Sequence, residues 1–356
     1  MKCKRLPVRL NRTNNGRTIL NFPSITSLKR WPELIATFGL LMASSSYQIT
    51  THIARQASRS ATIAKLPSNH PGVEPHATTT TTSTTTTSTT TTTEPAPEEP
   101  RGGHTLIPGQ RIVAFYGAPG GSGLGILGKS SPEAMWPKLK AQAAPYQATG
   151  TPVLPAYELI TYIAQGSPQP NGTYSARLPN STIQQYLDVV QEHNGLLILD
   201  IQPGRGNFLK DAKTLAPFLS QPDVALALDP EWQVSATQVP GQIIGSTTAN
   251  DINQVSNWLE ELVTSNHLPQ KLLLIHQFKT SMVTNKAEVV TRPDLAIVFN
   301  MDGFGSWHAK VAAYQRLAQD HRFPLGFKLF YKQDVPLEDP SQVMELQPQP
   351  DVIEYE

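Results

Sequence analysis

The chain has 356 residues, with 29 Lys and Arg against 28 Asp and Glu, and a single cysteine. One cysteine excludes a disulfide framework, and a chain that is 39% hydrophobic and 16% charged is too apolar for complete disorder and too polar for a multi-span membrane protein. Eight basic residues precede the first acidic one, Glu33, whereas from Arg101 onward 23 acidic residues outnumber 18 basic ones. An acidic globular region argues against a nucleic acid as partner.

The first 50 residues have the plan of an export signal. A basic region, residues 1–32, leads into an apolar core of ten residues, Leu34–Ala43, and a cleavage site at Ala43-Ser44-Ser45 fits the small-residue exit. Segment 33–50 is alternatively an uncleaved signal anchor that contacts the membrane, or a buried soluble helix. Cys3 precedes the apolar core, so it is not the lipidated cysteine of a lipoprotein signal. The sequence predicts an exported protein, either secreted or anchored at the cell surface.

Residues 51–110 have the composition of a stalk. An unbroken Thr/Ser tract, Thr78–Thr93, is followed by the Pro/Glu-rich stretch 94–100. Neither part has an apolar face to bury, so we expect an extended, disordered Thr/Ser/Pro-rich spacer. Low complexity without any tethering role is the alternative.

From residue 111 to residue 356, short apolar runs alternate with helical patterns. The predicted strands are Arg111–Tyr116, Pro152–Tyr157, Leu196–Asp200, Val224–Asp229, Lys271–Gln277, Ala296–Asp302, Gly326–Tyr331 and a weak eighth, Asp351–Tyr355. The predicted helices are Pro132–Ala144, Thr182–His193, Phe208–Leu219, Asp251–Asn266 and Trp307–Asp320. Nearly continuous apolar strands are typical of a parallel sheet that is covered on both faces. The pattern predicts a (β/α)8 TIM-type barrel, complete or irregular, with an open doubly wound sheet as the alternative.

Acidic side chains recur where the predicted strands end. In a barrel, the carboxyl ends of the strands converge on one mouth, so these side chains are expected to meet there and to raise one another's pKa. We predict Glu231 as general acid, Asp229 as the residue that orients it or the substrate, and Asp200 or Asp302 as base or nucleophile. The predicted substrate-binding residues are Tyr116, Glu158, Trp232, Gln277, Tyr331 and Arg205.

Several of these residues have a purely structural interpretation as well. Asp200 and Asp302 are also suitable caps for a following turn, and Pro-Glu-Trp is also a helix start with a core tryptophan, Trp232. His276 and Gln277 are neighbours on one strand, so only one of them faces the mouth, and we favour Gln277. The long segment Leu159–Pro179 is interpreted either as a lid or binding loop or as a surface insertion.

Motifs for metals and cofactors are missing from the sequence. There is no H-E-x-x-H, no C-x-x-C and no histidine cluster, and the glycine-rich stretch Gly117–Gly125 contains a proline where a dinucleotide-binding turn would be tight. The sequence therefore predicts neither a metal nor a cofactor.

Seven strings in the order F-Y-G-A-P, P-A-Y-E-L-I, L-L-I-L-D-I-Q-P-G-R, A-L-D-P-E-W, L-L-L-I-H-Q-F, N-M-D-G-F-G and G-F-K-L-F-Y span residues 111–356. In these strings the chain resembles an uncharacterised family of exported bacterial proteins, mainly actinobacterial. The resemblance implies export and a barrel similar to those of glycoside hydrolases. With the strand-end acids it indicates a carbohydrate-active barrel that acts on a polysaccharide; a non-catalytic barrel that binds a glycan or a protein is the alternative.

Overall fold

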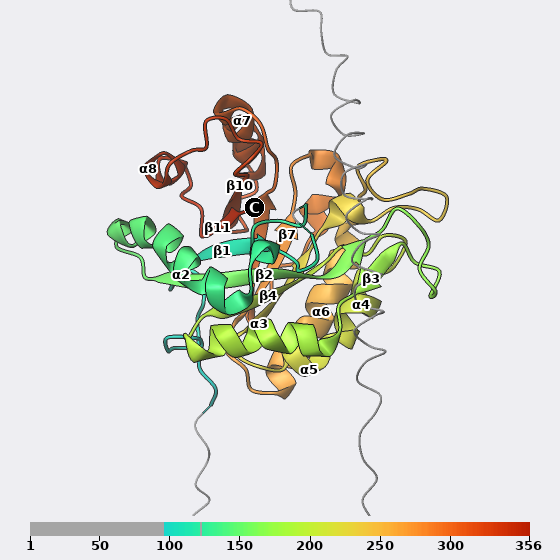
Figure 1. Cartoon of the computed structure of the whole chain (residues 1–356), viewed down its shortest axis with the longest axis horizontal. Helices are drawn as coiled ribbons and strands as arrows, with labels where there is room; N and C mark the ends of the chain where they lie inside the picture. The colour runs from blue at the N-terminus through green and yellow to red at the C-terminus, as the bar shows by residue number, and fades with distance from the viewer. Residues whose placement is uncertain (1–95, 122) are drawn as a thin grey trace, which may run out of the picture.

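The computed structural model describes residues 96–121 and 123–356, which form a closed barrel of parallel strands (Figure 1). The predictions for the basic region, the apolar core and residues 51–95 of the stalk lie outside the described residues. The strand order is β1-β11-β10-β9-β7-β5-β4-β2, and β1 pairs in parallel with both β2 and β11, which closes the sheet on itself. The closed sheet confirms the predicted (β/α)8 barrel and excludes the open doubly wound sheet.

The barrel strands are β1 (Arg111–Gly117), β2 (Val153–Ala164), β4 (Leu196–Ile201), β5 (Val224–Leu228), β7 (Lys271–His276), β9 (Leu295–Met301), β10 (Leu325–Leu329) and β11 (Val352–Tyr355). The helices outside them are α2 (Pro132–Ala143), α3 (Asn180–Glu192), α4 (Phe208–Thr214), α5 (Ala216–Leu219), α6 (Ala249–Ser265), α7 (Trp307–Leu317) and α8 (Pro340–Met344). Short strands and 3-10 turns complete the described part: β3 (Ser175–Arg177), β6 (Thr247–Thr248), β8 (Val283–Thr284), η1 (Leu127–Lys129), η2 (Ala144–Thr149), η3 (Pro230–Trp232), η4 (Thr280–Met282) and η5 (Lys286–Glu288).

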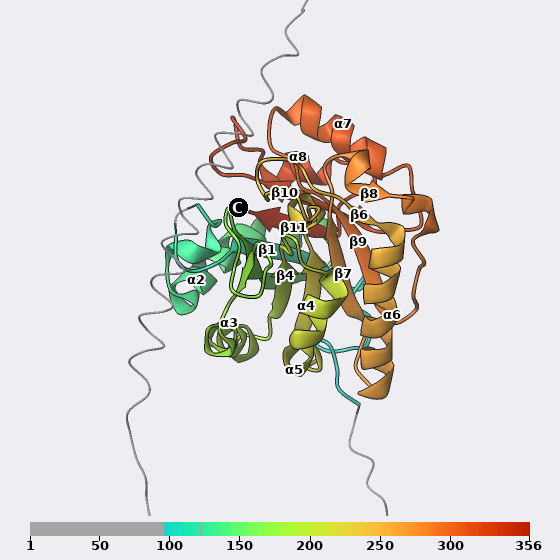
Figure 2. The ribbon, with the colours of Figure 1, turned by 90° about the vertical axis from the view of Figure 1, so that its right-hand side faces the viewer.

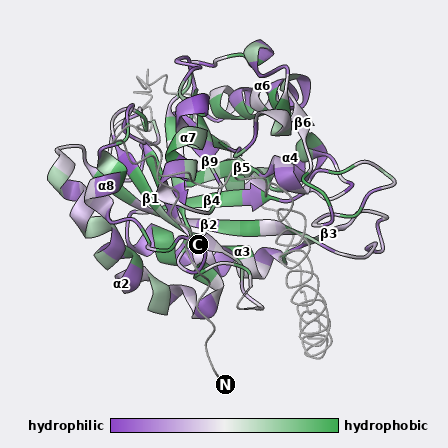
Figure 3. Cartoon of the chain, turned by 90° about the horizontal axis from the view of Figure 1, so that it is seen from above, coloured by the Kyte–Doolittle hydropathy of each residue, from purple (hydrophilic) through white to green (hydrophobic). Residues whose placement is uncertain are grey.

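The helices surround the strands on the outside of the barrel (Figure 2). Seen from above, β2 and β4 are largely hydrophobic, whereas α2 and α6 alternate between hydrophobic and hydrophilic residues (Figure 3). This is the pattern expected when each helix packs one face on the sheet and exposes the other. In the described part of the chain, no helix is long and apolar enough to span a membrane.

Strand residues alternate between two separate cores. Leu272 and Leu274 of β7 belong to the cluster inside the barrel, whereas Leu273 and Ile275 belong to the larger cluster between the sheet and the helices. The same alternation holds on the other strands, because successive side chains point to opposite faces. Every second residue of a strand therefore points into the barrel, and the last such residue lies at its mouth.

The segment predicted as a lid or insertion after the second strand begins and ends in strands that pair with each other. β2 continues to Ala164, and β3 pairs with it antiparallel, with Ile163 opposite Ala176. β2 also shifts register against β4 between Ile160 and Tyr162, which is the irregularity expected of a β-bulge. The segment is a β-hairpin that extends the barrel wall, and the loop proper is confined to the residues between the two strands.

The opposite end of the barrel is covered by residues that we assigned to the stalk. Leu106 and Ile107 are buried and belong to the interior cluster. Their backbone N–H groups both donate to Gln270 Oε1 at 3.1 Å, and Arg101 Nη1 donates to Val153 O at 2.6 Å. The folded body therefore begins upstream of Arg111, and residues 99–110 form the floor of the barrel.

Candidate functional site

His276 lies at the centre of a polar cluster inside the mouth of the barrel. Its Nε2 is 2.8 Å from Glu158 Oε1, and its Nδ1 is 2.9 Å from Asp302 Oδ2 and 3.8 Å from Glu354 Oε2. Burial opposes the charged form, but Glu158, Glu354 and Asp302 raise the pKa of His276 well above its usual value. The charged imidazolium is therefore favoured, with Nε2 hydrogen-bonded to Glu158 and Nδ1 in an ion pair with Asp302.

The prediction that Gln277 faces the mouth was wrong. His276 has the same parity as Leu272 and Leu274, which point into the barrel, so His276 also points inward and Gln277 outward. Gln277 Nε2 donates to Lys279 O at 3.1 Å outside the barrel wall. Both residues are buried, so the hydrophobic pattern alone contained no information on the choice.

Lys328 is the second buried cation of the cluster. Its Nζ lies 3.4 Å from Asp302 Oδ1, 3.0 Å from Glu356 Oε2 and 3.3 Å from the centre of the Tyr116 ring. Burial opposes its charge, but Asp302 and Glu356 raise the pKa of Lys328 well above its usual value. In return, Lys328 and His276 outweigh the burial of Asp302 and lower its pKa to about 2. Asp302 is therefore ionised over the whole physiological range.

Asp200 and Asp229 face each other across the Tyr116 hydroxyl. Tyr116 Oη lies 3.3 Å from Asp200 Oδ2 and 3.5 Å from Asp229 Oδ2, and it accepts from Gln202 Nε2 at 3.0 Å. Burial and the neighbouring Asp229 raise the pKa of Asp200, and burial raises that of Asp229 to about 7. Asp200 Oδ1 and Asp229 Oδ1 are buried with no hydrogen-bond partner, so full charge on both is costly. This pair holds at least one proton at neutral pH.

Glu231 lies on the 3-10 turn η3 at the edge of the cluster and is partly exposed. The turn is held by the following loop, because Gly245 N donates to Glu231 O at 2.6 Å. A Cβ at Gly245 would lie 2.2 Å from Gln233 O and 2.7 Å from Glu231 O, so this close approach requires glycine. Burial and the charges of Asp229 and Asp302 raise the pKa of Glu231 well above its usual value. These effects favour the protonated form of Glu231, whereas Lys328 and His276 favour the ionised form of Asp302.

Tyr116 and Glu158 of the predicted substrate-binding residues belong to this cluster, whereas Trp232, Tyr331 and Arg205 make their contacts elsewhere. Trp232 is only 7% exposed, which agrees with the interpretation as a core tryptophan at a helix start. Tyr331 donates to Gln142 Oε1 at 2.8 Å and stacks on Tyr355. Arg205 donates to Gln238 O at 2.7 Å and lies 3.8 Å above the Tyr174 ring.

Glu158, Asp200 and His276 are the members of the cluster best placed to bind a metal ion. One potential ligand atom of each lies within 4.8 Å of the others. However, Nε2 of His276 is hydrogen-bonded to Glu158 and Nδ1 is ion-paired with Asp302, and the protonated ring that these carboxylates favour has no lone pair to offer. The donor set therefore fits a proton network better than a metal centre.

The sequence analysis missed four members of the cluster. Lys328 on β10, Asn300 on β9, and Glu354 and Glu356 at the end of β11 point into the barrel, and Asn300 Nδ2 donates to Glu354 Oε2. These residues could have been found as charged or amide residues inside otherwise apolar strands. On β9 this residue is Asn300, two residues before Asp302, and on β11 it is Glu354, two residues before Glu356.

The barrel is similar to two solved endoglucanase structures. A GH5-4 broad specificity endoglucanase from Clostridium longisporum has 10% sequence identity and a TM-score of 0.35, over 61% of this chain and 75% of that chain. A hyperthermophilic endo-β-1,4-glucanase, solved in complex with substrate, has 8% identity and a TM-score of 0.29, over 57% of this chain and 76% of that chain. No protein-family model and no curated protein sequence matches the chain.

Proposed function

We propose that the chain is a glycoside hydrolase whose active site is the carboxyl cluster at the barrel mouth. The observation that carries the proposal is that the surroundings of two acids at the mouth shift their pKa values in opposite directions: burial and the charges of Asp229 and Asp302 raise the pKa of Glu231, whereas Lys328 and His276 lower that of Asp302 to about 2. Hydrolysis of a glycosidic bond needs one carboxyl group that donates a proton and one carboxylate that acts as base or nucleophile.

In this proposal Glu231 protonates the glycosidic oxygen as the bond to the anomeric carbon breaks, and Asp229 positions Glu231. Between the two predicted bases, Asp302 is favoured over Asp200, because Asp200 has a raised pKa and is fully buried whereas Asp302 is ionised and 8% exposed. Asp302 either takes a proton from the attacking water or attacks the anomeric carbon itself. The anomer of the first product, read by NMR, distinguishes the two routes.

Phe304 takes the substrate-stacking role that we predicted for Trp232. It follows Asp302 by two residues, is 43% exposed and contacts Phe330 edge-on, with ring centroids 5.7 Å apart. Its loop is fixed because Gly305 N donates to Asp334 Oδ1 at 2.9 Å. An exposed, braced aromatic ring beside the ionised acid is a suitable platform for a sugar ring.

The proposed substrate is a cell-surface or extracellular polysaccharide. The support is the sequence pattern of residues 1–110, which predicts export and a spacer that holds the barrel away from a membrane or wall. Cell fractionation with an antibody against the barrel tests this part separately. Full-length protein with an intact N-terminus in the cytoplasm would contradict export without affecting the proposed chemistry.

A barrel that binds a glycan without cleaving it is the second candidate. It is favoured by the burial of Asp200, Asp229 and His276, which leaves only the edge of the cluster open to a ligand. Under this alternative, Phe304→Ala weakens binding and Glu231→Gln has little effect, because stacking and not proton transfer supplies the affinity.

The test is a screen of the full-length chain against cell-wall, capsular and plant polysaccharides, with reducing-end release and binding measured in parallel. Hydrolysis predicts that Glu231→Gln lowers kcat about a hundredfold or more, with binding retained. Glu133→Gln, an exposed glutamate on α2, is the matched control and keeps full activity. Binding of a glycan with no release by the unmodified chain would support the second candidate and reject the first.

A further inference from the structure

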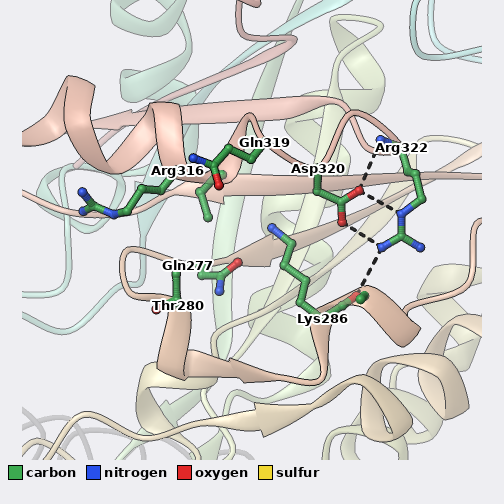
Figure 4. Close-up of a pocket in the computed structure, with 9 residues that line it drawn as sticks. Gln277, Thr280, Lys286, Arg316, Gln319, Asp320 and Arg322 are labelled. Atoms are coloured by element: carbon green, nitrogen blue, oxygen red, sulfur yellow. Dashed lines mark hydrogen bonds and ion pairs between the residues drawn. The ribbon is translucent and has the colours of Figure 1, made fainter.

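A cavity of about 520 Å³ lies on the flank of the barrel, outside the carboxyl cluster. It is open to solvent and is bordered by the segment after β7, which contains η4 and η5, and by the end of α7 with the turn that follows (Figure 4). The side chains of Gln277 and Lys286 extend toward its middle from one side, and Arg316, Asp320 and Arg322 border it on the other. This volume is within the range of pockets that bind small molecules.

The charges around this flank pocket do not balance. Asp320 is already neutralised by Arg322, whose Nε and Nη2 donate to its two carboxylate oxygens at 2.8 Å each. Lys286 Nζ lies 3.6 Å from the centre of the Phe299 ring, and within the described chain neither Lys286 nor Arg316 forms an ion pair with an acid. Two cations therefore border the pocket without a matching anion.

Gln277 supplies an independent sign of a missing ligand. The residue is 1% exposed, and its Nε2 donates to Lys279 O, but its Oε1 is buried with no partner. A buried carbonyl oxygen without a donor costs about 1–3 kcal/mol. A ligand that satisfies it must bring an N–H or O–H group, and a cationic ligand would be repelled by Lys286 and Arg316. An anion that also carries a hydroxyl group meets both requirements.

We propose that the flank pocket binds a small hydroxylated oxyanion, a sugar that carries a phosphate or a carboxylate group. Lys286 and Arg316 pair with the oxyanion, and Gln277 Oε1 accepts from a sugar hydroxyl. This proposal is independent of the proposed hydrolase activity, because no residue of the carboxyl cluster takes part. Gln277 follows His276 directly, so the bound ligand lies on the outer side of the barrel wall beside the cluster.

The protonation of Lys286 gives the site a pH signature. Burial lowers the pKa of Lys286 to about 8; Asp320 opposes this, and Arg322 adds to it. The groups that face its ammonium are the Phe299 ring, Asp320 and Arg322. A bound oxyanion raises the pKa again, so binding near pH 8 takes up protons and weakens as the pH rises further.

Isothermal titration calorimetry on the full-length chain tests the proposal with glucose 6-phosphate, glucuronate, glucose and inorganic phosphate at pH 7. We expect at least one of the two charged sugars to bind at least tenfold more tightly than glucose and than inorganic phosphate. The tighter of the two identifies the oxyanion. Absence of binding by both charged sugars, or equal binding by glucose or inorganic phosphate, overturns the proposal.

Variants locate the binding in the flank pocket. Lys286→Gln is expected to weaken binding at least tenfold, whereas Lys286→Arg retains it and Lys213→Gln, an exposed lysine elsewhere, is without effect. Near-UV circular dichroism shows whether each variant is folded, and the Arg variant keeps the test valid if the Gln variant is not. Unchanged affinity in folded Lys286→Gln, or loss of binding in folded Lys286→Arg, contradicts the assignment.

Discussion

Asp229→Asn should change how the stability of the barrel depends on pH. Burial raises the pKa of Asp229 to about 7, whereas the pKa of an aspartate in an unfolded chain is about 3.9. The folded state therefore binds this proton more tightly, and its contribution to stability is complete below the unfolded pKa and is lost as the pH rises to about 7. Each pH unit in the middle of that window costs about 1.4 kcal/mol, and the cost falls off near pH 7, so the loss from pH 5 to pH 7 is about 2 kcal/mol.

The assay is urea unfolding at pH 5 and pH 7, and the quantity of interest is the difference between variant and unmodified chain. Asn cannot ionise, so Asp229→Asn is expected to remove about 2 kcal/mol of the pH dependence. Because the charge of Asp229 also raises the pKa of Asp200 and of Glu231, the measured difference includes the change in their titration. Asp188→Asn, at an exposed aspartate of α3, is the control and should leave the pH dependence unchanged. An identical pH dependence in Asp229→Asn would refute the reasoning.

Two further predictions concern stability. Leu106→Ala removes a fully buried side chain from the barrel floor and is expected to lower the free energy of unfolding by about 3 kcal/mol. The control, Thr105→Ala at an exposed residue, should cause no measurable change. Equal stability of the two variants would show that residues 99–110 are not part of the folded body. Lys328→Met leaves Asp302 and Glu356 without their buried cation and should destabilise the barrel by about 3 kcal/mol or more in denaturant unfolding. Lys140→Met, on the exposed face of α2, serves as control. Unchanged stability in Lys328→Met would contradict the proposed charge balance.

The barrel could be predicted because its strands are short, nearly continuous apolar runs in the sequence. The run Leu196–Asp200 became β4, Leu196–Ile201, and the helix start at Ser131 and Pro132 is where α2 begins. The boundaries of the helices were predicted less accurately. The helix predicted from Asp251 begins at Ala249, because Thr248 is its N-cap and Asp251, the third residue of the helix, completes the capping box. Local signals thus identified the elements, and cap geometry shifted their boundaries.

The site was predictable in part for the same reason. Acids at strand ends converge in any parallel barrel, so Asp200 and Asp229 could be placed at the mouth from strand positions alone. The direction of His276 could not, because all of β7 is buried and its apolar residues do not alternate with polar ones. Lys328 was missed because it lies within a strand between two apolar residues, and its acid partners follow the two adjacent strands, β9 and β11.

The predicted helix Phe208–Leu219 shows how one residue divides an element. The run Phe208–Leu219 was predicted as one helix, but the structure has α4 and α5 with Leu215 between them. Pro217 lies at the start of α5 and has no N–H to donate to the preceding turn, so the first helix cannot continue through it. Proline in a predicted helix was the available signal.

The central claim is that Glu231 is protonated while Asp302 is ionised at the same mouth and the same pH. Infrared difference spectroscopy at pH 7 measures this directly, by subtracting the spectra of Glu231→Gln and of Asp302→Asn from that of the unmodified chain. We expect the first difference to contain the band of a protonated carboxyl group and the second to contain the bands of a carboxylate. Carboxylate bands for both residues at pH 7 would contradict the separation of acid and base on which the proposed hydrolysis depends.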